Sequence, residues 1–176
     1  MIIVLEGCDC VGKTTFAEML SEKTGYEIVK GSSFEISELG ADGMFNHMMK
    51  LLDRESIIID RFFYSNLVYG KLYNYPMMSI SQYMDLTNKL NKKALVLYLQ
   101  AYHYAIVERM EKRGDDMIKA DDIGRILDLY RESMNGIFMP KLMLSIDTTN
   151  ANFDYHTNMI KGVIEQESFR KLIETT

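Results

Sequence analysis

The chain has 176 residues, of which 47% are hydrophobic and 26% are charged, the balance of an ordinary globular domain. That composition excludes a disordered, collagen-like or coiled-coil protein, and the length predicts one domain spanning residues 1–176. The formal charge of −5 argues against a nucleic acid as the main partner, because nucleic-acid backbones are bound by clustered cations. A small anionic ligand in a locally basic cleft is compatible with it.

The cysteines and histidines form no pattern typical of a disulfide framework or a metal site. Cys8 and Cys10 are the two cysteines, and the three histidines are scattered singly, which is too little for either. The first apolar run, residues 1–5, is too short for a signal peptide or a membrane span. We therefore expect a reduced, cytoplasmic protein with no membrane partner.

Short apolar runs alternate with segments of helical periodicity. The runs are residues 2–5, 26–29, 57–59, 94–99 and 142–146. Runs that are apolar on both faces are typical of parallel strands covered on both sides, and the segments between them carry apolar residues at three- and four-residue steps. The alternation predicts an α/β fold of three layers, with a parallel five-stranded sheet flanked by helices.

Residues 7–14 match the pattern G-x-x-x-x-G-K-[ST], which is typical of a phosphate-binding loop between a strand and a helix. Its glycines let backbone N–H groups surround phosphate oxygens, and the helix N-terminus adds a partial positive charge. Lys13 is expected to reach the β- and γ-phosphates of ATP, and the Thr14 hydroxyl to bind Mg²⁺. The residues expected to hold ATP are Gly7, Cys8, Asp9, Cys10, Val11, Gly12, Lys13, Thr14 and Thr15. At a helix N-terminus, the two thiols should be somewhat acidified.

An acid and a cation end the third apolar run. Asp60 and Arg61 follow three isoleucines, at the strand end where open α/β sheets bind ligands. Asp60 is expected to hold Mg²⁺ directly or through water, and the planar fork of Arg61 suits a phosphate. Two phosphate-binding sets in one small domain indicate phosphoryl transfer, which depends on positioning and charge neutralisation.

Two motifs resemble those of thymidylate kinases. They are Glu6-Gly7-x-Asp9-x-x-Gly12-Lys13-Thr14-Thr15 and Asp60-Arg61-Phe62-x-x-Ser65-x-x-Val68-Tyr69. Arg109-x-x-x-Arg113-Gly114 is similar to that family's arginine-bearing lid, and Ile146-Asp147-Thr148 to its final strand and adenine-side loop. The resemblance spans residues 2 to about 165 and implies the three-layer P-loop kinase fold.

The resemblance also implies roles on the acceptor side. Arg61 would clamp the acceptor monophosphate, and Asp9 would face the 3′-hydroxyl of its sugar. Tyr69 would lie against that sugar and exclude a 2′-hydroxyl, while Ser65 would support this end of the site. If residues 61–69 form one helix, Arg61 and Tyr69 lie about 12 Å apart along its axis and within a quarter-turn of each other.

The same resemblance places a mobile lid at about residues 109–122. Arg109 and Arg113 would belong to it, one directed toward the adenine of ATP and the other toward the transferred phosphoryl group. The phosphate loop has no second cation between Gly7 and Gly12, so we expect Arg113 to be catalytic together with Lys13, Arg61 and Asp60. Arg109 is then expected to contact ATP.

The chain departs from the family pattern where the base is recognised. Gly70 replaces the glutamine that often follows the tyrosine, and Arg54 stands at the wrong end of its helix to read a thymine carbonyl. Aromatic residues follow Arg61, and we expect at least one ring to contact the ligand. They are Phe62, Phe63, Tyr64, Tyr69 and Tyr73. The family is commonly homodimeric, and the methionine-rich stripe at residues 44–52 fits either a homodimer interface or the core.

The leading hypothesis is an ATP- and Mg²⁺-dependent kinase that phosphorylates a pyrimidine deoxynucleoside monophosphate (dTMP, dUMP or a modified relative) to the diphosphate. The alternative is a deoxynucleoside kinase that phosphorylates a 5′-hydroxyl and needs a base, for which Glu35 or Glu38 is the candidate. A regulatory nucleotide-binding switch is a third hypothesis, although the chain lacks the Asn-Lys-x-Asp box of GTPases.

Overall fold

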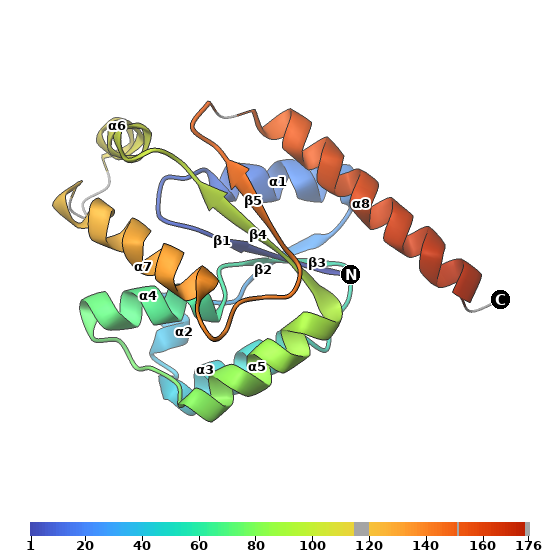
Figure 1. Ribbon diagram of the computed structural model, residues 1–176, viewed down its shortest axis with the longest axis horizontal. Coiled ribbons are helices and arrows are strands. Elements are labelled where there is room, and N and C mark those ends of the chain that lie inside the picture. The colour runs from blue at the N-terminus through green and yellow to red at the C-terminus, as the bar shows by residue number, and fades with distance from the viewer. Residues whose placement is uncertain (115–119, 151, 175–176) are drawn as a thin grey trace.

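The computed structural model describes residues 1–114, 120–150 and 152–174, and its centre is a five-stranded parallel sheet (Figure 1). The strands are β1 (Ile2–Glu6), β2 (Glu27–Lys30), β3 (Ile57–Asp60), β4 (Ala94–Gln100) and β5 (Met143–Asp147). Their order across the sheet is β2-β3-β1-β4-β5, and every neighbouring pair is parallel. The predicted strands are thus confirmed to within one residue at each end.

Helices cover both faces of the sheet. They are α1 (Lys13–Thr24), α2 (Phe34–Ser37), α3 (Gly40–Leu51), α4 (Phe63–Tyr73), α5 (Ile80–Lys93), α6 (His103–Arg113), α7 (Ile123–Asn135) and α8 (Phe153–Glu174), with a 3₁₀ turn at Ala120–Asp122. Helices α1 and α8 pack together on one face, and α3, α4, α5 and α7 lie on the other (Figure 1). The predicted three-layer architecture is confirmed.

The central strands carry the continuous apolar runs because helices cover them on both faces. Ile3, Val4 and Ile58 are fully buried, whereas Ile28 on the edge strand β2 is 38% exposed. Strand order is the part of the topology that the apolar pattern did not predict, since a doubly covered run carries no information about its neighbours.

The methionine-rich stripe of α3 belongs to the core. Met44, Met48 and Leu52 are fully buried, because α3 packs beside α5 against the sheet. Of the two readings left open for this stripe, the structure supports the core, since these side chains are enclosed by their own chain.

The parallel arrangement places all strand ends that carry polar motifs at one edge of the sheet. Strand β1 runs into the loop before α1, β3 ends at Asp60, and α6 follows the carboxyl end of β4 (Figure 1). Among the described residues, no helix combines the length and apolar character needed to cross a membrane.

Candidate active site

The loop between β1 and α1 depends on glycine at two positions. Gly7 has φ of +143° and Gly12, the N-cap of α1, has φ of +91°, a region in which side chains are strained. A Cβ on Gly7 would lie 2.3 Å from the Leu99 carbonyl oxygen, and one on Gly12 would lie 2.5 Å from the Phe153 ring. The backbone of the loop therefore packs directly against Leu99 and Phe153, with no room for a side chain at either glycine.

Lys13 lies over this loop. Its buried ammonium donates hydrogen bonds to the carbonyl oxygens of Gly7 (2.8 Å) and Cys8 (2.7 Å). Burial, reinforced by the positive charge of Arg61, lowers the pKa of Lys13 to about 8. An anion at the loop would offset that repulsion and favour the charged lysine.

A cavity of about 440 Å³ opens beside the loop. Thr14, Asp60 and Arg109 are among the residues that line it. One carboxylate oxygen of Asp60 is buried and has no hydrogen-bond partner among the described residues, which fits an acid that holds a cation or its water shell. The described residues contain no cluster of three or more histidine, cysteine, aspartate or glutamate side chains that could hold a metal by themselves. A Mg²⁺ ion here would need nucleotide phosphates as further ligands, as this ion usually does.

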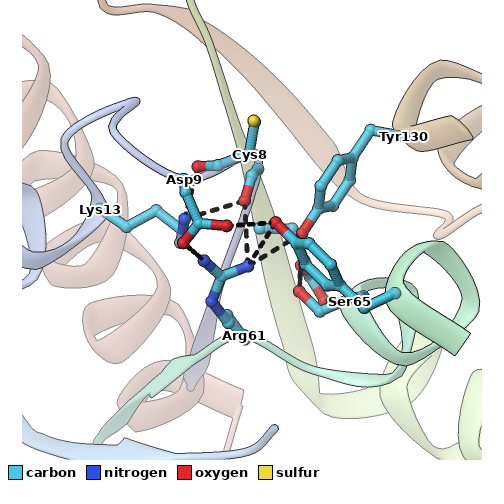
Figure 2. Close-up of polar contacts among 9 residues, drawn as sticks. Cys8, Asp9, Lys13, Arg61, Ser65 and Tyr130 are labelled. Carbon is cyan, nitrogen blue, oxygen red and sulfur yellow. Dashed lines mark hydrogen bonds and ion pairs between the residues drawn. The ribbon is translucent and has the colours of Figure 1, made fainter. Parts of the chain in front are cut away.

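Arg61 lies between that cavity and a second one, and lines both. Its φ of +61° is left-handed, so the residue turns away from β3 before α4 begins. The guanidinium forms an ion pair with Asp9 and donates from Nη1 to the hydroxyls of Tyr69 (3.3 Å) and Tyr130 (3.2 Å) (Figure 2). The helical spacing predicted between Arg61 and Tyr69 is wrong, because Arg61 precedes the helix and reaches the Tyr69 side chain directly.

Asp9 binds Arg61 and Tyr69 at the same time. One carboxylate oxygen pairs with Arg61, and the other accepts a 2.5 Å hydrogen bond from Tyr69. Burial alone would raise the pKa of Asp9, but the charges of Arg61 and Lys13 outweigh it and hold this pKa below its ordinary value. Asp9 is therefore an ionised carboxylate between the phosphate loop and the arginine.

A buried hydrogen-bond network lies next to Arg61 and contains Glu6, Ser65 and Tyr130. The Glu6 carboxylate, at the end of β1, accepts hydrogen bonds from the backbone of Phe62 (2.7 Å) and from the Ser65 hydroxyl (2.6 Å). The Ser65 hydroxyl is also 2.8 Å from that of Tyr130. Burial raises the pKa of Glu6 to about 7 despite these donors. Ser65 thus bonds to Glu6 and Tyr130 next to Arg61 and, like Arg61, lines the second cavity described below.

The second cavity, of about 320 Å³, extends from Arg61 toward α2 and α4. Tyr69 and Tyr73 line it with parallel rings 6.1 Å apart, so two of the five aromatic side chains expected near the ligand face this cavity. Tyr75 closes its far end against Tyr73 (5.8 Å) and Phe34 (6.0 Å).

The residue that departs from the family pattern has a packing role here. A Cβ on Gly70 would lie 2.7 Å from the Met77 side chain, so glycine lets the segment after α4 fold closely over the helix and bring Tyr75 to the cavity. The remaining aromatic residues of the predicted cluster, Phe62, Phe63 and Tyr64, are fully buried in the core. Arg54 pairs with Glu27 on the surface and lies in neither cavity, as its position in the sequence indicated.

The two lid arginines differ in their surroundings. Arg109 donates to the carbonyl oxygens of Cys10 (3.3 Å), Thr148 (2.6 Å) and Thr149 (3.0 Å), and so ties the phosphate loop to the segment after β5. Arg113, at the end of α6, lines both cavities. Of the predicted lid at 109–122, residues 115–119 lie outside the described residues.

Sequence reasoning missed one residue of the site and was wrong about another. Tyr130 belongs to the apolar stripe of α7 and is fully buried, but its hydroxyl also contacts Arg61; a tyrosine in an otherwise aliphatic stripe was the available signal. The thiol of Cys8 is not acidified, because burial outweighs the nearby cations and raises its pKa to about 12.

The fold and this arrangement of loop, lysine and arginine define a P-loop kinase of the nucleotide-kinase type. No family model matches the chain. It is 45% identical to the SPbeta prophage-derived protein YorR of Bacillus subtilis, over 76% of this chain and 82% of that protein. It is 30% identical to a probable thymidylate kinase of Methanococcus maripaludis, over 92% of this chain and 94% of that protein. The chain belongs to the same family as these two proteins.

Solved structures agree with this assignment. The crystal structure of YorR in complex with phosphorylated GDP superposes with a TM-score of 0.87 and 40% identity, covering 96% of this chain and 98% of that one. The structure of deoxyadenosine kinase from M. mycoides superposes with a TM-score of 0.63 over 94% of this chain and 100% of that one. Its identity of 20% makes it a comparison of fold alone.

Proposed function

We propose that the protein transfers the γ-phosphoryl group of ATP to a pyrimidine deoxynucleoside monophosphate, dTMP, dUMP or a modified relative, and forms the diphosphate. The observation that carries this proposal is the position of Arg61, which lines both cavities and offers its guanidinium where they meet. An acceptor phosphate bound to Arg61 would lie next to the phosphate loop, so donor and acceptor phosphates would be neighbours.

The proposed reaction needs positioning and charge neutralisation. Lys13 would stabilise the charge on the β- and γ-phosphates, and Arg113 would face the phosphoryl group in transfer. Arg61 would orient the acceptor phosphate through its planar fork, and an oxygen of that phosphate attacks without losing a proton to the protein. Bound with ATP by Thr14 and Asp60, Mg²⁺ would add further neutralisation of phosphate charge.

The acceptor cavity supports a monophosphate rather than a nucleoside. Phosphorylation of a 5′-hydroxyl requires a general base within hydrogen-bond reach. Among the described residues that line this cavity, Asp9 supplies the one carboxylate. One of its oxygens accepts from Arg61 and the other from Tyr69, so both oxygens are already engaged. The two candidate bases, Glu35 and Glu38, do not line the cavity.

The relatives guide the choice of nucleotides to test. The M. maripaludis relative is named a probable thymidylate kinase, which supports a pyrimidine acceptor. The YorR crystal structure contains phosphorylated GDP, so a guanine nucleotide belongs in the test both as donor and as acceptor.

The experiment is a nucleotide panel with product analysis. ATP·Mg²⁺ and GTP·Mg²⁺ are each combined with deoxynucleosides, their 5′-monophosphates and the matching ribonucleotides, and the phosphorylated products are resolved by chromatography. We expect diphosphates from dTMP or dUMP. In Arg61→Lys, the acceptor KM should rise and kcat should fall while the KM for ATP changes little, because an ammonium cannot reproduce a planar fork. Monophosphates formed from nucleosides, or diphosphates from dGMP alone, would overturn the proposal.

A further inference from the structure

Tyr130 is a fully buried tyrosine whose hydroxyl contacts Arg61 behind the acceptor cavity. It comes from α7 and is 0% exposed. Its ring stacks on Tyr98 at 6.1 Å and meets the edge of Tyr69 at 6.2 Å. These ring contacts hold the side chain on both sides, so the position of its hydroxyl is defined by packing.

That hydroxyl connects Arg61, through Ser65, to the Glu6 carboxylate. Arg61 Nη1 lies 3.2 Å from the Tyr130 oxygen, which lies 2.8 Å from the Ser65 hydroxyl. Ser65 in turn donates to Glu6 at 2.6 Å. Figure 2 shows Tyr130 from α7, Ser65 from α4 and Arg61 from the turn between β3 and α4 converging on one another.

The donors and acceptors of this chain have one consistent direction when Glu6 is ionised. Arg61 can only donate and Ser65 uses its proton toward Glu6, so the Tyr130 hydroxyl donates to Ser65 and accepts from Arg61. Burial raises the pKa of Tyr130 well above its ordinary value, so the phenol keeps the proton that this direction needs. Successive hydrogen bonds of this kind strengthen one another.

The network restrains the side chain of Arg61, whose backbone N–H is bonded to the Leu5 carbonyl oxygen but whose guanidinium extends away from the sheet. Arg61 has left-handed φ and stands between β3 and α4, and its Nη2 is drawn toward the charge of Asp9. The hydroxyls of Tyr69 and Tyr130 bind Nη1 and oppose rotation of the guanidinium toward Asp9. Tyr69 is itself bound to Asp9 (2.5 Å), whereas Tyr130 is bound through Ser65 to Glu6.

We infer that Tyr130 is the positioning residue of the acceptor-phosphate clamp: through its hydroxyl it holds the Arg61 guanidinium in the orientation that receives the phosphate of a nucleoside monophosphate. This inference rests on the proposed function, because it assigns the acceptor to Arg61. It extends that function to a residue from the helix after the lid arginines, which neither sequence motif contains.

The test compares two tyrosines that each lose one buried hydroxyl. Tyr130→Phe keeps the stacked ring and removes the contacts to Arg61 and Ser65. The matched control is Tyr64→Phe, since Tyr64 is also fully buried and donates to the Phe138 carbonyl at 2.7 Å but contacts neither Arg61 nor Ser65 in the hydrogen-bond network. Steady-state kinetics, thermal unfolding and calorimetric titration with dTMP are measured for both variants and the wild type.

We expect Tyr130→Phe to raise the KM and Kd for dTMP about tenfold, with the KM for ATP within about twofold of the wild type. Tyr64→Phe should leave all three constants near wild type even where its thermal stability falls as much. In the double variant with Arg61→Lys, the loss should be no greater than in Arg61→Lys alone, because residues that act as one unit are not additive.

Three outcomes for the variants would overturn the inference. They are an unchanged dTMP affinity in Tyr130→Phe, equal rises in the constants for ATP and dTMP, and additive losses in the double variant. The calorimetric titration separates the inference from the proposed function. A wild type that binds dTMP without phosphorylating it overturns the function alone, and a wild type that neither binds nor phosphorylates any monophosphate overturns both.

Discussion

Asp9 and Arg61, 52 residues apart in the chain, form an ion pair where the two cavities meet. The pair joins the phosphate loop to the end of β3. An acceptor phosphate that binds Arg61 must therefore share the guanidinium with Asp9, which remains ionised because the charges of Arg61 and Lys13 overcome the effect of burial on its pKa. The third member of this group is Tyr69, whose hydroxyl touches both.

Tyr69 has two expected roles, in sugar selection and in the contacts to Asp9 and Arg61, that substitutions can separate. Tyr69→Ala should raise the activity on ribonucleotides relative to deoxyribonucleotides by roughly tenfold to a hundredfold, because the ring would no longer bury a 2′-hydroxyl without a partner. Tyr69→Phe keeps the ring and should leave that ratio unchanged. It should nevertheless lower kcat/KM for both substrates, since the hydrogen bonds to Asp9 and Arg61 are lost. The measurement is kcat/KM for dUMP and UMP in all three proteins. An unchanged ratio in the alanine variant would rule out the role in sugar selection.

Alanine substitutions of the two lid arginines should change different kinetic constants. Arg113→Ala should lower kcat by roughly 10³-fold, as loss of an arginine finger does, with small changes in both KM values. Arg109→Ala should mainly raise the KM for ATP, because Arg109 is bound to three backbone carbonyls that connect the phosphate loop to the segment after β5. Initial rates over a matrix of ATP and dTMP concentrations distinguish the two patterns. If Arg113→Ala lost less than about tenfold, the catalytic cation would have to be another residue.

Lys13→Ala should lower turnover by roughly several hundredfold, because it removes charge neutralisation at the transferred phosphates. Lys23→Ala is the matched control: Lys23 lies on the same helix but pairs with Asp154 on the surface, and its variant should retain wild-type turnover. Circular dichroism of both variants checks that the fold is retained. Near-normal turnover in Lys13→Ala would argue against phosphoryl transfer at this loop.

The raised pKa of Glu6 predicts that the stability of the fold depends on pH. Burial raises its pKa to about 7 in the folded chain, from 4.5 as the ordinary value. Between these values the folded state binds more protons than the unfolded state, so the Glu6 contribution to the free energy of unfolding falls as pH rises, by up to about 3 kcal/mol. Glu6→Gln should remove this decline. Urea unfolding of both proteins at pH 5 and pH 8 measures the difference, with the exposed Glu18→Gln as control. Parallel profiles for wild type and Glu6→Gln would contradict the assignment.

The sequence predicted those parts of the site that follow from local spacing. The loop around Lys13 and the Asp60-Arg61 pair each occupy a few consecutive residues at a strand end, and both lie where they were expected. The ring of Tyr69 also reaches the predicted cavity, although by a different geometry, because the left-handed turn at Arg61 is a feature of one residue that periodicity does not encode.

The rest depends on contacts between distant segments. Tyr130 reads as one more apolar position of a helix, and only the packing of α4 against α7 brings its hydroxyl to Arg61. The same is true of Phe34 and Tyr75, which meet from the segments after β2 and α4. The acidity of Cys8 was also not predictable from local sequence. A helix N-terminus was expected to lower the pKa of its thiol, but burial by distant segments raises it.

The succession of Asp60 and Arg61 has a consequence for how the two substrates stay aligned. Asp60 lines the cavity beside the phosphate loop and Arg61 also lines the second cavity, yet their Cα atoms are separated by a single peptide unit, about 3.8 Å long. Strand β3 is hydrogen-bonded to a neighbour on each side. The peptide itself is held on both sides, because the Asp60 carbonyl oxygen accepts from the Gly31 N–H and the Arg61 N–H donates to the Leu5 carbonyl oxygen. If Asp60 holds the donor's cation and Arg61 the acceptor's phosphate, as proposed above, the backbone spacing between the two groups is a property of the covalent chain itself.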